Sequence, residues 1–121
     1  MSRVVHFDIV ADKPDRASRF YGSVFGWKFR KWDGPMNYWM IDTGKDGQGI
    51  NGGMGLKSES KMPNMNTIDV KDIEKSIEKI KTNGGKLVGK KQPIPGVGWF
   101  ASFKDTEGNL FGLMQDDKSA K

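Results

Sequence analysis

The sequence contains no cysteine, a single histidine and no long apolar run. Without cysteine it has no disulfide, thiol nucleophile, iron–sulfur cluster or cysteine-ligated zinc. With His6 as the single histidine, a zinc site built from paired histidines of one chain is excluded. No stretch approaches the roughly 18 consecutive apolar residues of a membrane span, and no signal peptide is recognisable. We therefore expect a cytoplasmic protein that does not engage a membrane.

The charge balance is basic, with 20 Lys and Arg against 15 Asp and Glu and a net charge of +5. An excess of positive charge can indicate a nucleic-acid partner. The lysines are scattered, however, apart from small concentrations over residues 71–91 and at the C-terminus. This distribution is more typical of a lysine-rich surface than of nucleic-acid binding.

The first half of the chain predicts a strand, a helix and three further strands. Asp12 is a suitable N-cap for the helix, and Gly26 a suitable end. Alternation and β-branched or aromatic content predict strands over residues 4–10, 27–32, 37–42 and 50–56.

The second half repeats this order. A helix capped by Asp72 carries Ile73, Ile77 and Ile80 on one stripe. The predicted strands cover residues 65–70, 86–90, 99–103 and 110–115, with a loop over 92–98 and a frayed tail over 116–121.

An internal repeat of this kind constrains the fold more than any local motif does. It predicts an α+β protein of two βαβββ modules, which form a curved mixed sheet around a cleft. The modules are expected over residues 1–57 and 64–121, joined by a linker over 58–63 within one structural domain. A cleft at an internal interface is a usual place for a ligand.

Three stretches share the pattern of one protein family: HFDIVADKPDRASRFYGSVFGWKF, TIDVKDIEKSIEKIKTNGGKLV and IPGVGWFASFKDTEGNLFGLMQ. They resemble the vicinal-oxygen-chelate superfamily, which includes glyoxalase I, extradiol dioxygenases and bleomycin-resistance proteins. With the intervening strands, the resemblance covers nearly the whole chain. It implies paired βαβββ modules and a homodimer. For the family's enzymes it implies a divalent metal held by a histidine or its counterpart on each module's first strand and a Glu or Gln on each last strand.

The implied metal ligands are mostly missing. His6 stands fourteen residues before Phe20, which is the spacing of the family's first histidine. The other three positions fall at about Met65, near Gly52 and at Gly112, and these residues offer no imidazole or carboxylate. We therefore expect no metal site and no cofactor, with His6 the one ligand position retained. A divalent metal held by His6 is the alternative.

His6 and Asp8 lie two residues apart on a predicted strand, so their side chains point the same way. A carboxylate–imidazole pair makes them the best candidates for catalytic residues, if the protein is an enzyme. The alternative is a hydrogen-bonded histidine of purely structural value.

Strand alternation and the repeat together predict the side chains that line the cleft. Most are methionine or aromatic, which suits an irregular apolar ligand, although each could equally be ordinary core. The predicted ligand-binding residues are His6, Asp8, Tyr38, Met40, Met54, Met65, Thr67, Phe100, Ser102 and Met114. Trp32 and Trp99, near loops, are further candidates for a ligand or interface.

These observations favour a glyoxalase-like protein that binds a small, fairly apolar or aromatic organic molecule in the inter-module cleft without the family's usual metal. The alternative is a metal-dependent lyase or dioxygenase of the same superfamily, which would use His6 with atypical ligands such as Asp8. Whether the protein is an enzyme is left open.

Overall fold

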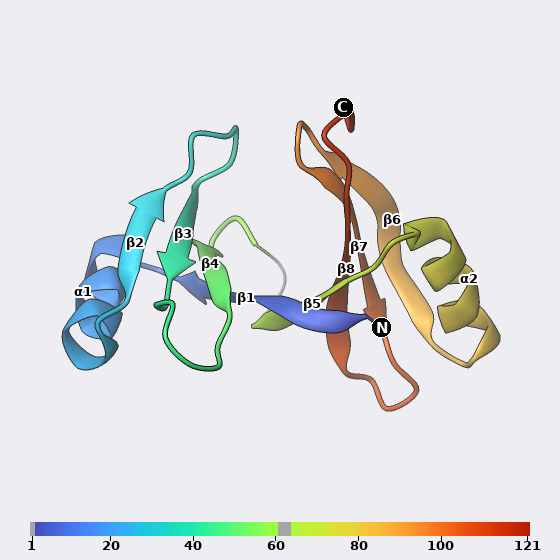
Figure 1. Cartoon of the computed structure of the whole chain (residues 1–121), viewed down its shortest axis with the longest axis horizontal. Coiled ribbons are helices and arrows are strands. Elements are labelled where there is room, and N and C mark those ends of the chain that lie inside the picture. The colour runs from blue at the N-terminus through green and yellow to red at the C-terminus, as the bar shows by residue number, and fades with distance from the viewer. Residues whose placement is uncertain (1, 61–63) are drawn as a thin grey trace. The chain divides into compact units, whose positions relative to one another are not determined.

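The computed structural model describes residues 2–60 and 64–121, and its elements follow the predicted repeat (Figure 1). The first module consists of β1 (Arg3–Ala11), α1 (Pro14–Phe25), β2 (Lys28–Lys31), β3 (Tyr38–Asp42) and β4 (Asn51–Leu56). The second consists of β5 (Met65–Asp69), α2 (Ile73–Thr82), β6 (Lys86–Ile94), β7 (Gly98–Lys104) and β8 (Leu110–Asp116). The α+β class and the two βαβββ modules are confirmed. Of the linker predicted over residues 58–63, residues 61–63 lie outside the described residues.

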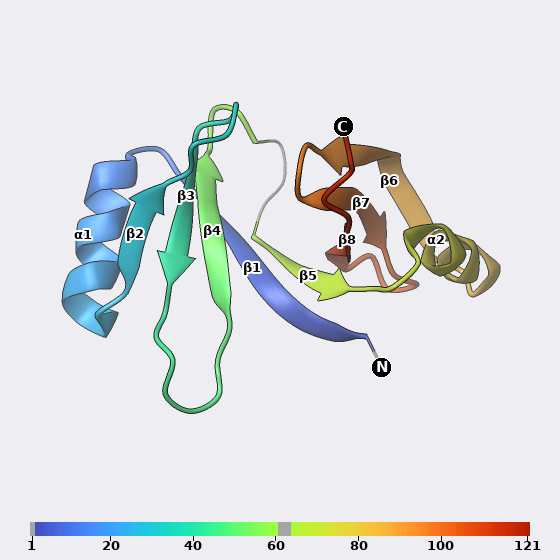
Figure 2. The ribbon, with the colours of Figure 1, turned by 45° about the horizontal axis from the view of Figure 1, so that its top comes forward.

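The first module has a mixed sheet in the order β2-β3-β4-β1, with β1 parallel to β4 and the other pairs antiparallel. Helix α1 lies beside β2 (Figure 2). Its Tyr21 ring stacks on Trp27 with centroids 5.1 Å apart, and Trp27 in turn contacts Phe7 of β1 at 5.6 Å. Phe7 and its strand partner Gly52 therefore face the helix, as does buried Ile41, whereas His6 and Asp8 point to the opposite face.

The start of α1 differs from the prediction by one residue. The N-cap is Lys13 rather than Asp12, and Pro14 occupies the first helical position. Proline is favoured there because its missing N–H would have no partner within the helix. The predicted end is confirmed, since Gly26 closes the helix with a left-handed φ of 77°. Neither helix of the described residues is long and apolar enough to cross a membrane.

The second module repeats this architecture with the strand order β6-β7-β8-β5 and a parallel β5–β8 pair. Asp72 caps α2 as predicted, accepting a hydrogen bond from the Lys75 backbone N–H at 3.1 Å. The predicted apolar stripe of α2 faces the core, where Ile73 and Ile77 are buried. The core cluster comprises Val70, Ile73, Ile77, Ala101, Phe103 and Leu113.

Two predictions about the second module are wrong. Strand β6 continues to Ile94, so residues 92–94 pair with β7 instead of forming a loop. Pro93 is tolerated because β6 is at the end of this module's strand order. The tail is not frayed: Ala120 is buried, and its carbonyl accepts from the Gly96 N–H at 3.0 Å. Asp117 also accepts a hydrogen bond from the Trp99 indole at 3.1 Å.

Candidate functional site

Three polar side chains converge on the face of the first module that points away from α1. The Tyr38 hydroxyl of β3 donates to Asp8 Oδ1 of β1 at 2.5 Å, and His6 Nε2 lies 2.8 Å from the same hydroxyl. His6 Nε2 and Asp8 Oδ1 are 3.4 Å apart. The His6 and Asp8 side chains are 30% and 25% exposed, so this His6–Asp8–Tyr38 cluster is accessible from one side.

A glycine allows this cluster to form across an intervening strand. β4 lies between β1 and β3, and its Gly53 pairs with Asp8 on one side and Met40 on the other. The Tyr38 ring passes over Gly53, where a Cβ atom would overlap the tyrosine ring and hydroxyl. A residue without a side chain is therefore required at this position.

The cluster has a defined protonation pattern. Burial, reinforced by the negative charge and hydrogen bond of Asp8, raises the pKa of Tyr38 well above its ordinary value of 10.0. The neutral Tyr38 hydroxyl donates its one proton to Asp8, so the Tyr38 oxygen accepts a hydrogen bond from His6 Nε2–H. The His6 tautomer with its proton on Nε2 is assigned from this hydrogen-bond network. His6 Nδ1 and Asp8 Oδ2 then remain as acceptors, and no described residue bonds to either.

Apolar side chains flank the cluster. Met40 is half-buried and shares its sheet face, since it pairs with Gly53. Trp32 meets the Tyr38 ring edge-on, with centroids 6.2 Å apart. Asn37, the residue before Tyr38, donates a side-chain hydrogen bond to Glu59 at 2.9 Å. The site therefore combines hydrogen-bond acceptors with apolar surface.

The second module repeats the aromatic-over-glycine arrangement without these polar groups. Phe100 of β7 corresponds to Tyr38, and a Cβ at Gly112 of β8 would lie 2.8 Å from the Phe100 ring and from Thr67 Oγ1. Thr67, in the place of Asp8, is buried. Phenylalanine has no hydroxyl, so no equivalent of the Tyr38 hydrogen bonds forms here.

The structure brings together some of the predicted site residues and separates others. His6, Asp8 and Tyr38 are in contact, and Met40 lies on the same face. In the second module, one sheet face carries Thr67, Phe100, Ser102 and Met114, and Met65 is buried on the same side of β5 as Thr67.

Met54 and Gly52 lie on the other side of the first sheet. Met54 pairs with Ile9 and Trp39, faces α1 and is 0% exposed. A Cβ at Gly52 would meet the backbone and ring of Phe7. The glycine beside the cluster is therefore Gly53, whereas Gly52 points to the opposite face of the sheet. In the sequence, the adjacent glycines of β4 are the only sign that an aromatic ring passes over this strand.

The donors of the first module do not fit the metal site that the family resemblance implies. His6 and Asp8 are each engaged by the Tyr38 hydroxyl, and their β4 partners are Asn51 and Gly53. Within residues 2–60 and 64–121, no three or more His, Cys, Asp or Glu residues are arranged to hold a metal ion.

Residues 3–113 match the model of the Glyoxalase/Bleomycin resistance protein/Dioxygenase superfamily. The chain belongs to this superfamily, as the two modules also indicate. No curated protein matches it in sequence.

Several solved structures share the fold. A hypothetical protein from Bacillus halodurans C-125 is 20% identical with a TM-score of 0.72, covering 99% of this chain and 98% of that one. Methylmalonyl-CoA epimerase from Mycobacterium tuberculosis is 14% identical, with a TM-score of 0.71 and coverage of 94% and 87%. A superfamily member from Vibrio splendidus 12B01 is 18% identical, with a TM-score of 0.65 and coverage of 96% and 100%. At these identities the likeness shows the fold.

Proposed function

We propose that this glyoxalase-like protein binds a small, fairly apolar or aromatic organic molecule without the family's usual metal. The His6–Asp8–Tyr38 cluster is the observation that carries the proposal. A half-buried, neutral tyrosine holds an imidazole and a carboxylate in place, and both remain accessible from one side. Polar groups fixed in this way, beside apolar surface, are typical of small-molecule sites.

The free acceptors define what the ligand must offer. Asp8 Oδ2 and His6 Nδ1 both accept hydrogen bonds, so a ligand with a hydroxyl or N–H donor is favoured, and the Asp8 carboxylate repels anions. Met40 and Trp32 supply apolar surface for the rest of the molecule. A phenol-like compound combines these features.

Two observations support a site without metal. The Tyr38 hydroxyl already engages both His6 and Asp8. The other family ligand positions carry residues such as Met65 and Gly112, which give no imidazole or carboxylate. The competing function is a metal-dependent lyase or dioxygenase that uses His6 with atypical ligands.

We expect 4-methylphenol to raise the melting temperature and 4-methylanisole to do so far less. The two probes have similar shape, but the ether has no donor for Asp8. Truncating Asp8 should weaken 4-methylphenol binding about tenfold, because hydrogen bonds to charged groups contribute about 1.5–3 kcal/mol. Thermal shift and calorimetric titration of Asp8→Ala against the wild type measure this.

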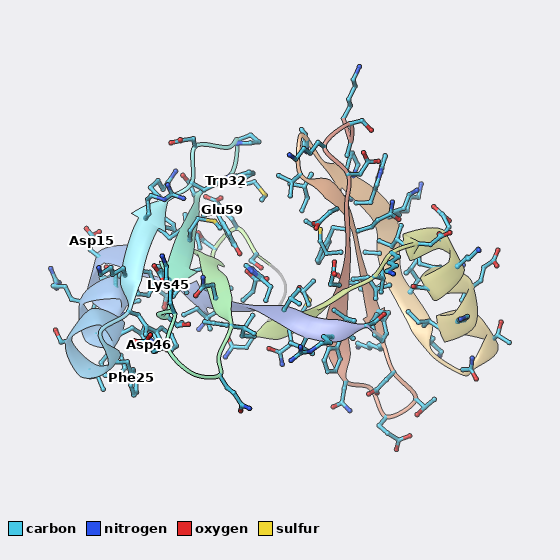
Figure 3. The ribbon with its side chains drawn as sticks, viewed as in Figure 1. Asp15, Phe25, Trp32, Lys45, Asp46 and Glu59 are labelled. Carbon is cyan, nitrogen blue, oxygen red and sulfur yellow. The ribbon has the colours of Figure 1, made fainter. Side chains whose placement is uncertain are left out.

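Asp46→Ala is the matched control, because Asp46 is an exposed carboxylate on the β3–β4 loop and forms none of the cluster's hydrogen bonds (Figure 3). Equal affinity for 4-methylphenol and 4-methylanisole would contradict the proposal. An equal loss of 4-methylphenol affinity in Asp8→Ala and Asp46→Ala would also contradict it.

The metal content of protein purified without chelator should stay far below one ion per chain. Near-stoichiometric metal that disappears in His6→Ala would instead establish the metal-dependent alternative.

We also propose that the protein is a homodimer, as the family resemblance implies. Val24 and Phe25 on α1 are 56% and 60% exposed, and such apolar surface suits contact with a second copy. Sedimentation velocity should give twice the chain mass, and the Val24→Glu/Phe25→Glu double variant should give the monomer. A monomeric wild type would refute this.

A further inference from the structure

The first module contains a second feature that the His6–Asp8–Tyr38 cluster does not use. A cavity of about 410 Å³, open to the surface, lies where β1 ends, α1 begins and β4 ends. None of the three cluster residues lines it. Its volume falls in the range of small-molecule sites, which is about 300–1,000 Å³.

The cavity wall is strongly basic. Lys13, Arg16 and Lys57 all line it, against Asp12 as the one acidic lining residue, which leaves a lining charge of +2 (three cations minus one carboxylate). No side chain that the structure describes forms an ion pair with these three cations. Lys57 is held beside the end of β1, because its backbone N–H donates to the Ala11 carbonyl at 2.9 Å. Three cations that have no ion-pair partner among the described side chains favour an anion.

One side of the cavity is a supported aromatic surface. Tyr21 lines it and is stacked on Trp27, with ring planes 9° apart. Phe20 also lines it and meets Tyr21 edge-on at 5.1 Å. Phe20 is 57% exposed, so its ring offers a face for a flat apolar group beside the stacked Tyr21.

We propose that this cavity binds a phosphate monoester that carries a flat apolar group. A phosphate monoester has a charge of about −1.5 to −2 at pH 7, which matches the lining charge. Arg16 can bind the phosphate oxygens with bidentate hydrogen bonds, and Lys13 and Lys57 supply further positive charge. The apolar group lies against Phe20 and Tyr21.

This ligand class is the opposite of the one proposed for the His6–Asp8–Tyr38 cluster. That cluster presents acceptors and a carboxylate, whereas this cavity presents cations. The two sites can therefore be tested, and can fail, independently.

The test is a titration of the full chain with phenyl phosphate, followed by amide chemical shifts in NMR. The largest shifts should come from residues 10–21 and Lys57, with inorganic phosphate and phenol each binding much more weakly there. Arg16→Gln and Lys57→Gln should each weaken phenyl phosphate about tenfold. Asp12→Asn should strengthen it.

Lys45→Gln is the matched control, because Lys45 is an exposed lysine on the β3–β4 loop outside the cavity (Figure 3). Its affinity should equal that of the wild type, and thermal unfolding checks that each variant is folded. Three results would overturn the proposal: no shifts at millimolar phenyl phosphate, inorganic phosphate binding as tightly as the ester, or Lys45→Gln weakening it as much as Lys57→Gln.

Discussion

Replacing Gly53 by alanine is expected to break the His6–Asp8–Tyr38 cluster and to lower the free energy of unfolding by about 1–3 kcal/mol. The new Cβ would occupy the space of the Tyr38 hydroxyl and ring, so the tyrosine must leave Asp8 and His6. The half-buried polar groups of the cluster then lose their partners. Urea unfolding measures the stability, and NMR of the Tyr38 and His6 rings reports the cluster.

Gly55→Ala is the control, since Gly55 lies two residues further along β4 on the same face with open space around it. Its stability should change little. Adding Tyr38→Ala to Gly53→Ala removes the overlap between the new Cβ and the Tyr38 ring. The losses of stability caused by the two substitutions should therefore not be additive. If Gly53→Ala and Gly55→Ala have the same effect, the placement of Tyr38 over Gly53 is wrong.

Replacing Met54 by alanine should have the largest effect on stability, with a loss of about 2–5 kcal/mol. Met54 is 0% exposed on the α1 side of the first sheet, so truncation leaves a cavity in the packed core. Chemical denaturation measures the loss. Because Met54 faces away from His6 and Asp8, folded Met54→Ala should keep its affinity for 4-methylphenol.

Met36→Ala is the matched control, since the same side chain is removed at a position that is 53% exposed. Its stability should stay within about 0.5 kcal/mol of the wild type. A Met54→Ala variant that remained fully stable but lost 4-methylphenol affinity would place Met54 in the binding site after all.

Much of the fold could be predicted from local patterns. Period-two alternation correctly separated His6 and Asp8 from Phe7 and Ile9, because successive side chains of a strand point to opposite faces. Asp72 and Gly26 correctly marked helix ends, because capping depends on a few neighbouring backbone groups.

The errors occurred where backbone pairing with another segment, and not local composition, decides the structure. Residues 92–94 have the composition of a loop, but they join the sheet because β7 supplies their hydrogen-bond partners. The polar tail is ordered because Asp117 and Ala120 find partners near Gly96 and Trp99. Gly96 and Trp99 are far from the tail in sequence.

The sequence by itself determined the repeat, the module architecture and the face that carries His6 and Asp8. Those features follow from periodicity and from single residues that restrict the backbone. Only the tertiary structure decided that Tyr38 joins them, because β4 must lie between β1 and β3 with Gly53 at the crossing point. It also decided that Met54 belongs to the core, since register assigns each residue of a paired strand to one face.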